Sequence, residues 1–549
     1  MLSSSRLKVA VLLLLFAVAW FANIQYRDLF NTDEGRYAEI PREMVVSGNW
    51  VTPHLDGLKY FEKPAMQYWL TAGAYVAFGE HTWTARLWTV VSGLLGLLFT
   101  YYAGLRLFDR RTGFLSAAVL AGSAYYSAMG HINTLDMGLT FFMTVSLFAF
   151  LLAQGASKDR AEQRLWMLLS FASAGGAVLS KGLIGIVIPG AVLVLYSLAK
   201  RDWGLWKRLH LVPGLAVFLV VTCPWFVVVS ERNPKFFWYF FIREHFERYL
   251  TPISHRHGAW WYFIPIFLLG VMPWLVQSGR GLLLGFQKSR RTNSGRFDTP
   301  YFLWVWVVFI LLFFTVSDSK LPSYILPVMP AFALLLGRQL VEATPSQVRT
   351  SAYISLAFGA IALFYLPYIG HNADARLPLK YFMAFVPWVQ VGVAVLLAGS
   401  VLCIVWAGRE KPDYAVTALA MAWFLGVQIV GTGTQTMAPA LSTHYLVRQL
   451  GDKNDRSIPF YSVNQYEQTL PFYLKRTVTL VGYRGELNFG LKQAPNKWVP
   501  DDKAFAERWK REPQALAVMS HQLYAEFRAQ GLPMKVLARD PRRIVVEKP

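Results

Sequence analysis

The sequence predicts a polytopic α-helical membrane protein that ends in a small α/β domain. Of its 549 residues, 54% are hydrophobic and only 16% are charged. Long apolar runs recur over the first 437 residues, which is typical of chains that cross a membrane many times. Residues 438–549 are more polar and alternate strand-like with helical patterns. These three observations together indicate the fold class.

The apolar runs predict about thirteen membrane-spanning helices. Their expected centres lie near residues 16, 95, 121, 144, 172, 191, 219, 269, 308, 333, 360, 396 and 424. With a cytoplasmic N-terminus, every inside connection carries at least two basic residues, as Arg110 and Arg111 or Arg409 and Lys411 illustrate. The positive-inside rule therefore favours an odd number of spans. It places residues 438–549 and the long connections 22–82 and 231–261 outside.

The connection 22–82 has helical patterning of its own. Apolar Tyr37, Ile40 and Met44 follow Asp33 at helical spacing, with charged residues between them. This pattern predicts an amphipathic helix lying along the membrane interface and bent at Pro41. A second helix is expected to begin at Pro64, a favourable first-turn residue.

The outer connection 231–261 and the C-terminal domain have distinct patterns. The aromatic run at 236–241 suits the headgroup level of a bilayer. In the C-terminal domain, strands are expected at 458–463, 477–481, 515–519 and 543–546, and helices at 504–511 and 521–529. A domain of about 110 residues is large enough to fold alone.

Composition also excludes some classes of protein. The net charge of +21 is explained first by anionic lipid surfaces, and no basic motif on a soluble domain suggests nucleic acid. Cys223 and Cys403 both lie in apolar runs, so neither a disulfide framework nor a cysteine metal site is expected.

Basic residues gather on the predicted outer side, where the positive-inside rule expects few. They are Arg36, Lys63, Lys181, Arg232, Lys235, Arg243, Arg248, Arg256 and Lys320. Cations beside apolar residues are what an anionic lipid headgroup and its tail require. For any one of them, snorkelling of a long side chain to the headgroup boundary is the simpler explanation. For the set, we favour a phosphate site.

Two carboxylates belong to the same predicted side. Asp33 follows the first span, and Asp136 stands where the fourth span begins. Either could instead cap its helix or complement the helix dipole. A transfer site built from the two acids is the functional alternative.

A metal site is a further hypothesis. Glu62 precedes Lys63 at a predicted helix start, and His245 lies in the other long connection. Carboxylate oxygen and imidazole nitrogen are ligands for zinc or magnesium. The competing interpretation is a salt bridge between Glu62 and a neighbouring cation.

Three segments resemble the 4-amino-4-deoxy-L-arabinose lipid A transferases, members of the GT-C class that also holds the protein O-mannosyltransferases. The segments are 33–40 (DEGRYAEI), 47–50 (SGNW) and 59–64 (KYFEKP), and segments 180–182 and 319–327 resemble further parts of the family. The resemblance implies a bacterial inner-membrane enzyme with a periplasmic site. It implies undecaprenyl phosphate-linked aminoarabinose as donor, lipid A phosphate as acceptor, and resistance to polymyxin and other cationic peptides.

The resemblance also implies roles for single residues. Asp33 becomes the acidic residue of the catalytic loop, and Asp136 stays the second catalytic candidate because of its place at the start of the fourth span. Phosphate contacts are assigned to Arg36, Lys63, Lys181 and Arg248, and pocket positions to Glu34, Tyr60 and Tyr324. A phosphate acceptor is already mostly dianionic near neutral pH, so Asp33 need not remove a proton. We therefore expect Asp33 to orient the sugar and to stabilise positive charge on its ring.

The sequence leaves two alternative functions open. One is a GT-C transferase that moves another sugar to a protein or a glycan. The other is a lipid transporter, which should hold ionisable residues near the bilayer centre and show repeated halves. Here the ionisable residues gather at span ends and no halves repeat, which favours an interfacial enzyme.

Overall fold

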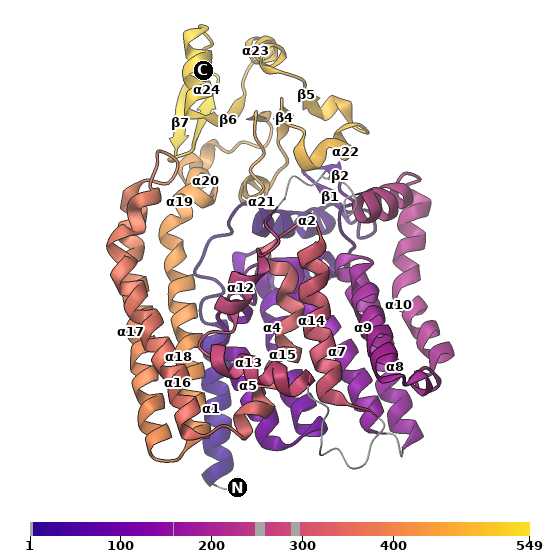
Figure 1. The fold of residues 1–549 in the computed structure, drawn as a ribbon. Coiled ribbons are helices and arrows are strands. Elements are labelled where there is room, and N and C mark those ends of the chain that lie inside the picture. The colour runs from indigo at the N-terminus through magenta and orange to yellow at the C-terminus, as the bar shows by residue number, and fades with distance from the viewer. Residues whose placement is uncertain (1–3, 157–158, 248–257, 287–296) are drawn as a thin grey trace.

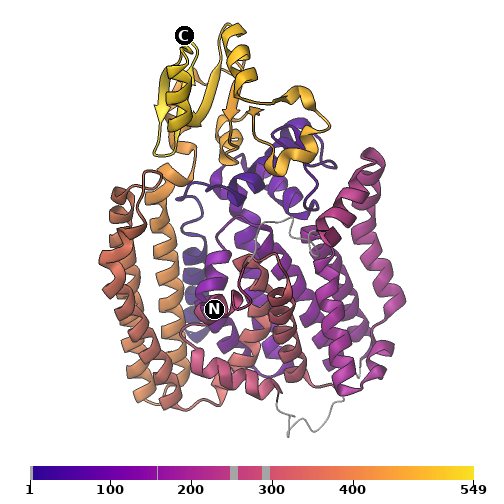
Figure 2. The same cartoon turned by 45° about the horizontal axis from the view of Figure 1, so that its top comes forward.

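Long apolar helices lie side by side through the larger part of the molecule, and a smaller sheet-containing domain covers one end of them (Figure 1). The structure is a computed structural model and describes residues 4–156, 159–247, 258–286 and 297–549. Figure 2 shows the C-terminal domain over the same end of the bundle from a second direction. The predicted fold class is confirmed.

The helices of the bundle coincide with the predicted spans. They are α1 (Ser4–Phe21), α4 (Thr82–Leu107), α5 (Arg110–Gly122), α6 (Ala124–Met129), α7 (Leu135–Gly155), α8 (Arg160–Lys181), α9 (Ile184–Lys200), α10 (Leu211–Arg232), α12 (Phe263–Gly270), α13 (Leu275–Phe286), α14 (Thr299–Val316), α15 (Met329–Val341), α16 (Pro345–Tyr365), α17 (Leu379–Gly408) and α18 (Pro412–Gly433). Each predicted centre falls within one of these helices.

The described residues contain fewer helices of span length than the thirteen predicted. Among the described residues, eight helices are long and apolar enough to cross a membrane, and the α12–α13 pair, bent by 104°, brings the number to nine. Helices α5 and α9 contain 13 and 17 residues and are shorter than a usual span. The count of thirteen therefore stays a prediction.

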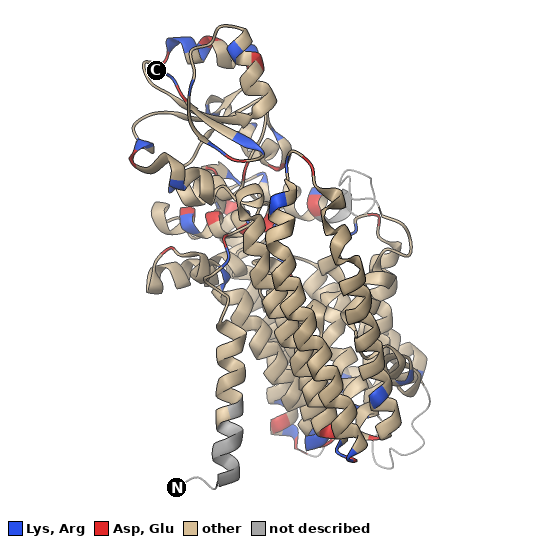
Figure 3. Ribbon diagram, turned by 90° about the vertical axis from the view of Figure 1, so that its left-hand side faces the viewer, with Lys and Arg blue, Asp and Glu red and all other residues tan. Residues whose placement is uncertain are grey.

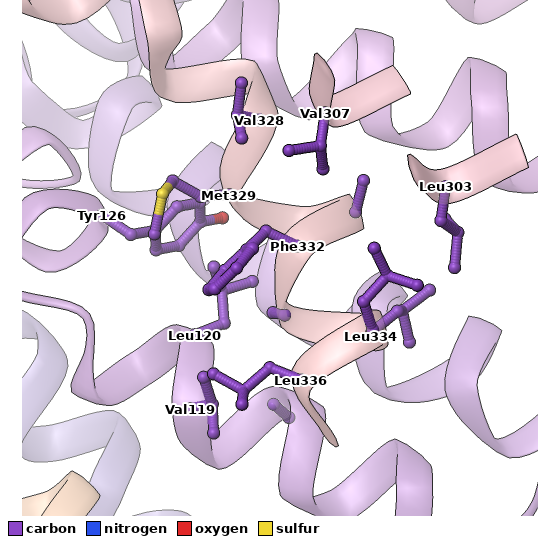
Figure 4. Packing of buried hydrophobic residues seen from close by; sticks show 14 of the residues in the cluster. Val119, Leu120, Tyr126, Leu303, Val307, Val328, Met329, Phe332, Leu334 and Leu336 are labelled. Atoms are coloured by element: carbon purple, nitrogen blue, oxygen red, sulfur yellow. The ribbon is translucent and has the colours of Figure 1, made fainter. Parts of the chain in front are cut away.

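The core of the bundle forms around α15. Its residues from Met329 to Leu336 are all buried, so this helix has no face toward lipid or water. Phe332 and Leu336 pack among side chains of α5 and α14 (Figure 4). Close helix contact also depends on small residues, because a Cβ on Gly104 of α4 would lie 2.6 Å from the Cα of Gly113 of α5.

Charged residues concentrate toward the two ends of the bundle and in the C-terminal domain, and are sparse along the middle of the helices (Figure 3). This distribution matches the cost of burying charge in hydrocarbon. It also agrees with the expectation of an interfacial site.

The outer connection 22–82 forms α2 (Asp33–Ser47), the short hairpin β1 (His54–Leu55) and β2 (Leu58–Lys59), and α3 (Met66–Phe78). The predicted helix is confirmed, and its place along the membrane interface stays a prediction, but its charged residues do not face water. Residues Glu34 to Met44 are all buried, because α3 and the C-terminal domain cover the helix. Its charges pair within the protein, as Arg42 does with Glu39 at 2.6 Å. Helix α3 begins two residues after Pro64.

The C-terminal domain contains a six-stranded mixed sheet. Its strands are β3 (Phe460–Val463), β4 (Thr479–Val481), β5 (Trp498–Val499), β6 (Leu516–Ser520), β7 (Lys535–Arg539) and β8 (Arg543–Glu547), in the order β5-β4-β3-β6-β8-β7. The first four are parallel, and β8 pairs antiparallel with β6 and β7. Its helices are α20 (His444–Leu450), α21 (Thr469–Leu474), α22 (Asn488–Leu491), α23 (Asp502–Arg511) and α24 (His521–Ala529).

All four predicted strands and both predicted helices of this domain are present. The sequence does not predict β5 and β7. Strand β5 has two residues, and β7 is a bulged edge strand whose ends, Lys535 and Arg539, are exposed. Neither has the run of buried apolar residues on which strand prediction depends.

Candidate functional site

A cavity of about 150 Å³ opens where α8, α9 and α14 meet η4 (Pro322–Val328). Its polar lining includes Lys63, Lys181 and Tyr324, three of the residues predicted for the site. Its apolar lining consists of Leu139, Ile184, Ile188, Phe313, Phe314 and Pro327. The cavity therefore joins two ammonium groups and one carboxylate, Glu244, to a hydrocarbon surface, and ammonium groups beside an apolar wall suit a lipid phosphate.

Lys181 occupies the last turn of α8, and its ammonium group forms an ion pair with Asp136 in the first turn of α7. Each charge complements the dipole of its own helix. The Lys181 Nζ also lies 4.6 Å from the centre of the Tyr324 ring. Asp136 thus holds Lys181 at the cavity, whereas the cap predicted as an alternative is absent, since Thr134 is the N-cap residue.

A second group of predicted residues surrounds Arg36 at the beginning of α2. Its guanidinium donates to Asp33 Oδ1 at 2.6 Å, and its other Nη lies 2.6 Å from Glu486 Oε2 of the C-terminal domain. The Tyr60 hydroxyl donates to the same Glu486 oxygen at 3.4 Å. Although burial opposes the charge of Arg36, the groups around it keep its pKa above the usual value.

The Tyr37 side chain is buried beside the Arg36 guanidinium, which lies 5.7 Å from the centre of its ring. Burial raises the pKa of the Tyr37 phenol, and the negative charges of Asp33, Asp136 and Glu62 raise it further. These three carboxylates therefore act on one phenol and face the same region of the protein. Asp33 therefore lies on the same side of the protein as Asp136, the partner of Lys181 in the cavity.

Asp33 suits contact with a substrate better than its neighbour does. Its side chain is 45% exposed, and its carboxylate pairs with Arg36 rather than capping the helix, because Thr32 is the N-cap residue. The pocket position predicted for Glu34 is wrong. Glu34 is buried and accepts from Arg27 at 2.9 Å and from Arg86 at 2.8 Å, which lower its pKa to about 2 against the effect of burial.

Not every predicted cation reaches the cavity. Arg36 lies outside its lining and is engaged by two carboxylates. Lys320 donates to the carbonyls of Thr315 and Ser317 at 3.0 and 2.8 Å, so it caps the end of α14. Arg248 lies outside the described residues.

The metal hypothesis is not tested by the described residues. Glu62 is adjacent to Lys63 of the cavity, and the side chain of His245 is outside the described part of the structure. Within that described part, no three His, Cys, Asp or Glu side chains gather as a metal site. The hypothesis stays a prediction.

Sequence reasoning missed Glu486, which completes the Arg36 group. It belongs to the C-terminal domain, and no local motif marks it. Only the fold brings it to α2, so pairing of Arg36 with a distant carboxylate was not foreseeable from spacing.

Two family models match the chain. Residues 5–280 match the dolichyl-phosphate-mannose-protein mannosyltransferase model, and residues 446–548 match the aminoarabinose transferase C-terminal domain. A protein of Erwinia tasmaniensis named undecaprenyl phosphate-alpha-4-amino-4-deoxy-L-arabinose arabinosyl transferase is 31% identical over 497 residues. The alignment covers 87% of this chain and 86% of that protein.

Two solved structures resemble this chain to different degrees. The crystal structure of ArnT from Cupriavidus metallidurans bound to undecaprenyl phosphate superposes with a TM-score of 0.94 at 37% identity and covers 98% of each chain. An oligosaccharyltransferase of Archaeoglobus fulgidus gives a TM-score of 0.51 at 13% identity, covering 95% of this chain and 71% of that one. The second likeness shows a shared fold alone.

Proposed function

We propose that this chain, which belongs to the undecaprenyl phosphate-aminoarabinose arabinosyl transferase family, transfers 4-amino-4-deoxy-L-arabinose from undecaprenyl phosphate to a phosphate of lipid A. The observation that supports this most strongly is the cavity that joins Lys63 and Lys181 to an apolar wall. The chain is a membrane glycosyltransferase. Its site faces the periplasm in our proposal, with the N-terminus in the cytoplasm.

The lysines act on the leaving group. As the bond between sugar and phosphate breaks, negative charge grows on the polyprenyl phosphate. Lys63 and Lys181 line the cavity, where they are placed to stabilise that charge. One such preorganised contact is typically worth ~3 kcal/mol in the transition state. The apolar wall formed by Ile184, Phe313 and their neighbours accommodates the lipid tail.

Asp33 acts on the sugar. Its exposed carboxylate, held by Arg36, is placed to orient the aminoarabinose and to stabilise positive charge on the ring. The attacking oxygen belongs to a phosphate that is already mostly dianionic, so no base is needed. Asp136 serves the reaction through Lys181, as a residue that fixes the ammonium rather than as an acid or base.

The competing functions differ in acceptor or in outcome. A protein or glycan acceptor would present a hydroxyl, which must lose a proton and therefore requires a base. A transporter would need ionisable groups along the middle of the helices, where Figure 3 displays few.

Mass spectrometry of lipid A tests the proposal. Cells that express the chain should add the mass of aminoarabinose to lipid A, and cells that express Asp33→Asn should not. Isolated membranes supplied with the donor and lipid A should reproduce the difference. Unmodified lipid A in both cultures, at equal protein levels, would refute the proposed acceptor.

A further inference from the structure

We propose that Asn31 is a positioning residue through which the C-terminal domain fixes the segment that carries Asp33. The inference rests on the proposed function, in which Asp33 contacts the sugar. It gives the C-terminal domain a part in catalysis that does not require it to touch the substrate.

The side chain of Asn31 is held by the C-terminal domain on both of its polar atoms. Its Oδ1 accepts from the backbone N–H and from the hydroxyl of Thr469, each at 3.0 Å. Its Nδ2 donates to the carboxylate of Glu467. The backbone N–H of Asn31 also donates to the carbonyl of Leu441 at 2.9 Å. An amide used in this way allows little freedom to Thr32, the one residue that separates it from Asp33.

The partner of Asn31 is itself fixed. Glu467 is buried and pairs with Arg543 of β8 at 2.5 Å, and Arg543 is fully buried and pairs with Asp540 at 2.7 Å. Arg543 also donates to the carbonyl of Ser442 at 2.7 Å. A buried ionic chain of this kind is costly to break, because each lost partner leaves an uncompensated charge. Asn31 is therefore attached to a rigid part of the C-terminal domain.

A second contact lies on the other side of Asp33. A Cβ on Gly35 would lie 2.5 Å from the backbone of Gln468 and Thr469, so the first turn of α2 meets the start of α21 without an intervening side chain. Figure 1 shows α21 directly over α2. Residues 467–469 thus contact the chain both before and after Asp33.

Backbone fixation matters because the Asp33 carboxylate is 45% exposed and gains little from packing of its own. Its position relative to the sugar depends on the segment that carries it. Displacement by about 1 Å can cost on the order of 100-fold in rate. The cavity lysines belong to other elements, so binding of the donor phosphate should be insensitive to Asn31.

The test uses the full chain and substitution of Asn31 by an isosteric acid. Asn31→Asp keeps the acceptor for Thr469 but sets a carboxylate against Glu467. We expect kcat to fall on the order of 10- to 100-fold while the KM for the donor changes by less than about 2-fold. Hydrogen exchange in a peptide spanning residues 28–40 should become faster. Asn31→Ala should cause the same effects without adding charge.

A double variant tests whether Asn31 positions Asp33 or is needed only for folding. In the double variant Asn31→Asp/Glu467→Gln, the glutamine can donate to the new carboxylate, and the charge of the cluster returns to its original value. Part of the lost kcat should return, because Glu467→Gln also takes one of the two carboxylate partners from Arg543, which keeps Asp540. Glu80→Gln is the matched control. Glu80 forms an ion pair with Lys475 of the same domain at 2.9 Å, and this pair does not involve the segment that carries Asp33. This control should keep normal kcat.

Two results would overturn the inference. One is normal kcat in Asn31→Asp while Asp33→Asn is inactive, which would leave the proposed function intact. The other is a loss that the double variant does not recover and that accompanies lower thermal stability than in Glu80→Gln, which would make Asn31 a folding residue. Full activity of Asp33→Asn would instead refute the proposed role of Asp33, and the positioning role with it.

Discussion

The guanidinium of Arg36 lies 2.6 Å from the carboxylate of Glu486, and this ion pair joins the first outer helix to the C-terminal domain. Arg36 holds Asp33 with its other nitrogen at the same distance. The C-terminal domain therefore supplies one of the two charges that balance Arg36. A site predicted from residues 31–63 alone is incomplete without it.

Substitution of Glu486 by Gln should lower activity. Arg36 would keep a single carboxylate partner and would draw Asp33 closer, away from the sugar. We expect a fall in kcat of about 10-fold, the size of one charge-assisted hydrogen bond. Glu512→Gln is the control, because Glu512 pairs with Arg508 elsewhere on the same domain. Equal activity of the two variants would contradict a role for Glu486.

Removal of the Lys181 ammonium should affect the chemical step. Lys181→Met leaves Asp136 without its cation and the leaving phosphate without one donor. A loss of on the order of 100- to 1,000-fold in kcat is expected for a preorganised contact of this kind. Lys235→Met, an exposed lysine just beyond the end of α10, should retain activity. Single-turnover rates measured with saturating donor separate this loss from weaker binding.

The pH dependence of Asp33→Asn distinguishes an electrostatic role from a base. Asparagine keeps the shape of the side chain and loses its charge. If Asp33 stabilises positive charge on the sugar, the residual rate stays low at every pH at which the enzyme is folded. Recovery of the rate at high pH would indicate that a proton had to be removed and would favour a hydroxyl acceptor.

Folding of the β1–β2 turn against the C-terminal domain should be most stable at acid pH, because burial disfavours the charged form of Asp56 although its hydrogen bond from Val478 favours that form. Asp56 is buried, and its Oδ1 accepts from the backbone N–H of Val478 at 2.7 Å. Burial raises the pKa of Asp56 to about 7, and the charge of Glu39 adds to the effect. The fold therefore binds a proton that the unfolded chain, with a pKa of about 4, releases.

The resulting stability is fully present below about pH 4 and is lost as the pH rises through about 7. We expect the midpoint of thermal unfolding to fall between pH 5 and pH 8. The fall should be smaller in Asp56→Asn, because an amide needs no proton to be buried. Some pH dependence should remain in this variant, since burial also raises the pKa of Glu43. Exposed Asp452→Asn should follow the original chain. An identical slope in Asp56→Asn would rule out Asp56 as the source.

Much of the fold follows from signals that are local in the chain. Apolar runs of span length place the helices, and strand patterns place β3, β4, β6 and β8. Contacts between distant segments carry no such signal. The burial of α2 could not be predicted, because the charges of Glu39 and Arg42 indicate a water-facing surface until the C-terminal domain covers them. Glu34 was misassigned for the same reason, since its partner Arg86 belongs to α4.

Dependence on a divalent metal is the remaining prediction for the site. If Glu62 and His245 bind zinc or magnesium beside the cavity, a chelator should lower kcat, and one of the two metals should restore it. Glu62→Gln should be slow with or without chelator, because an amide is a weaker ligand than a carboxylate. Metal content measured on the purified protein should fall in parallel, and Glu512→Gln, which changes a carboxylate of the C-terminal domain, serves as the control. Full activity after chelation, with no metal bound, would leave Glu62 as a partner for neighbouring cations.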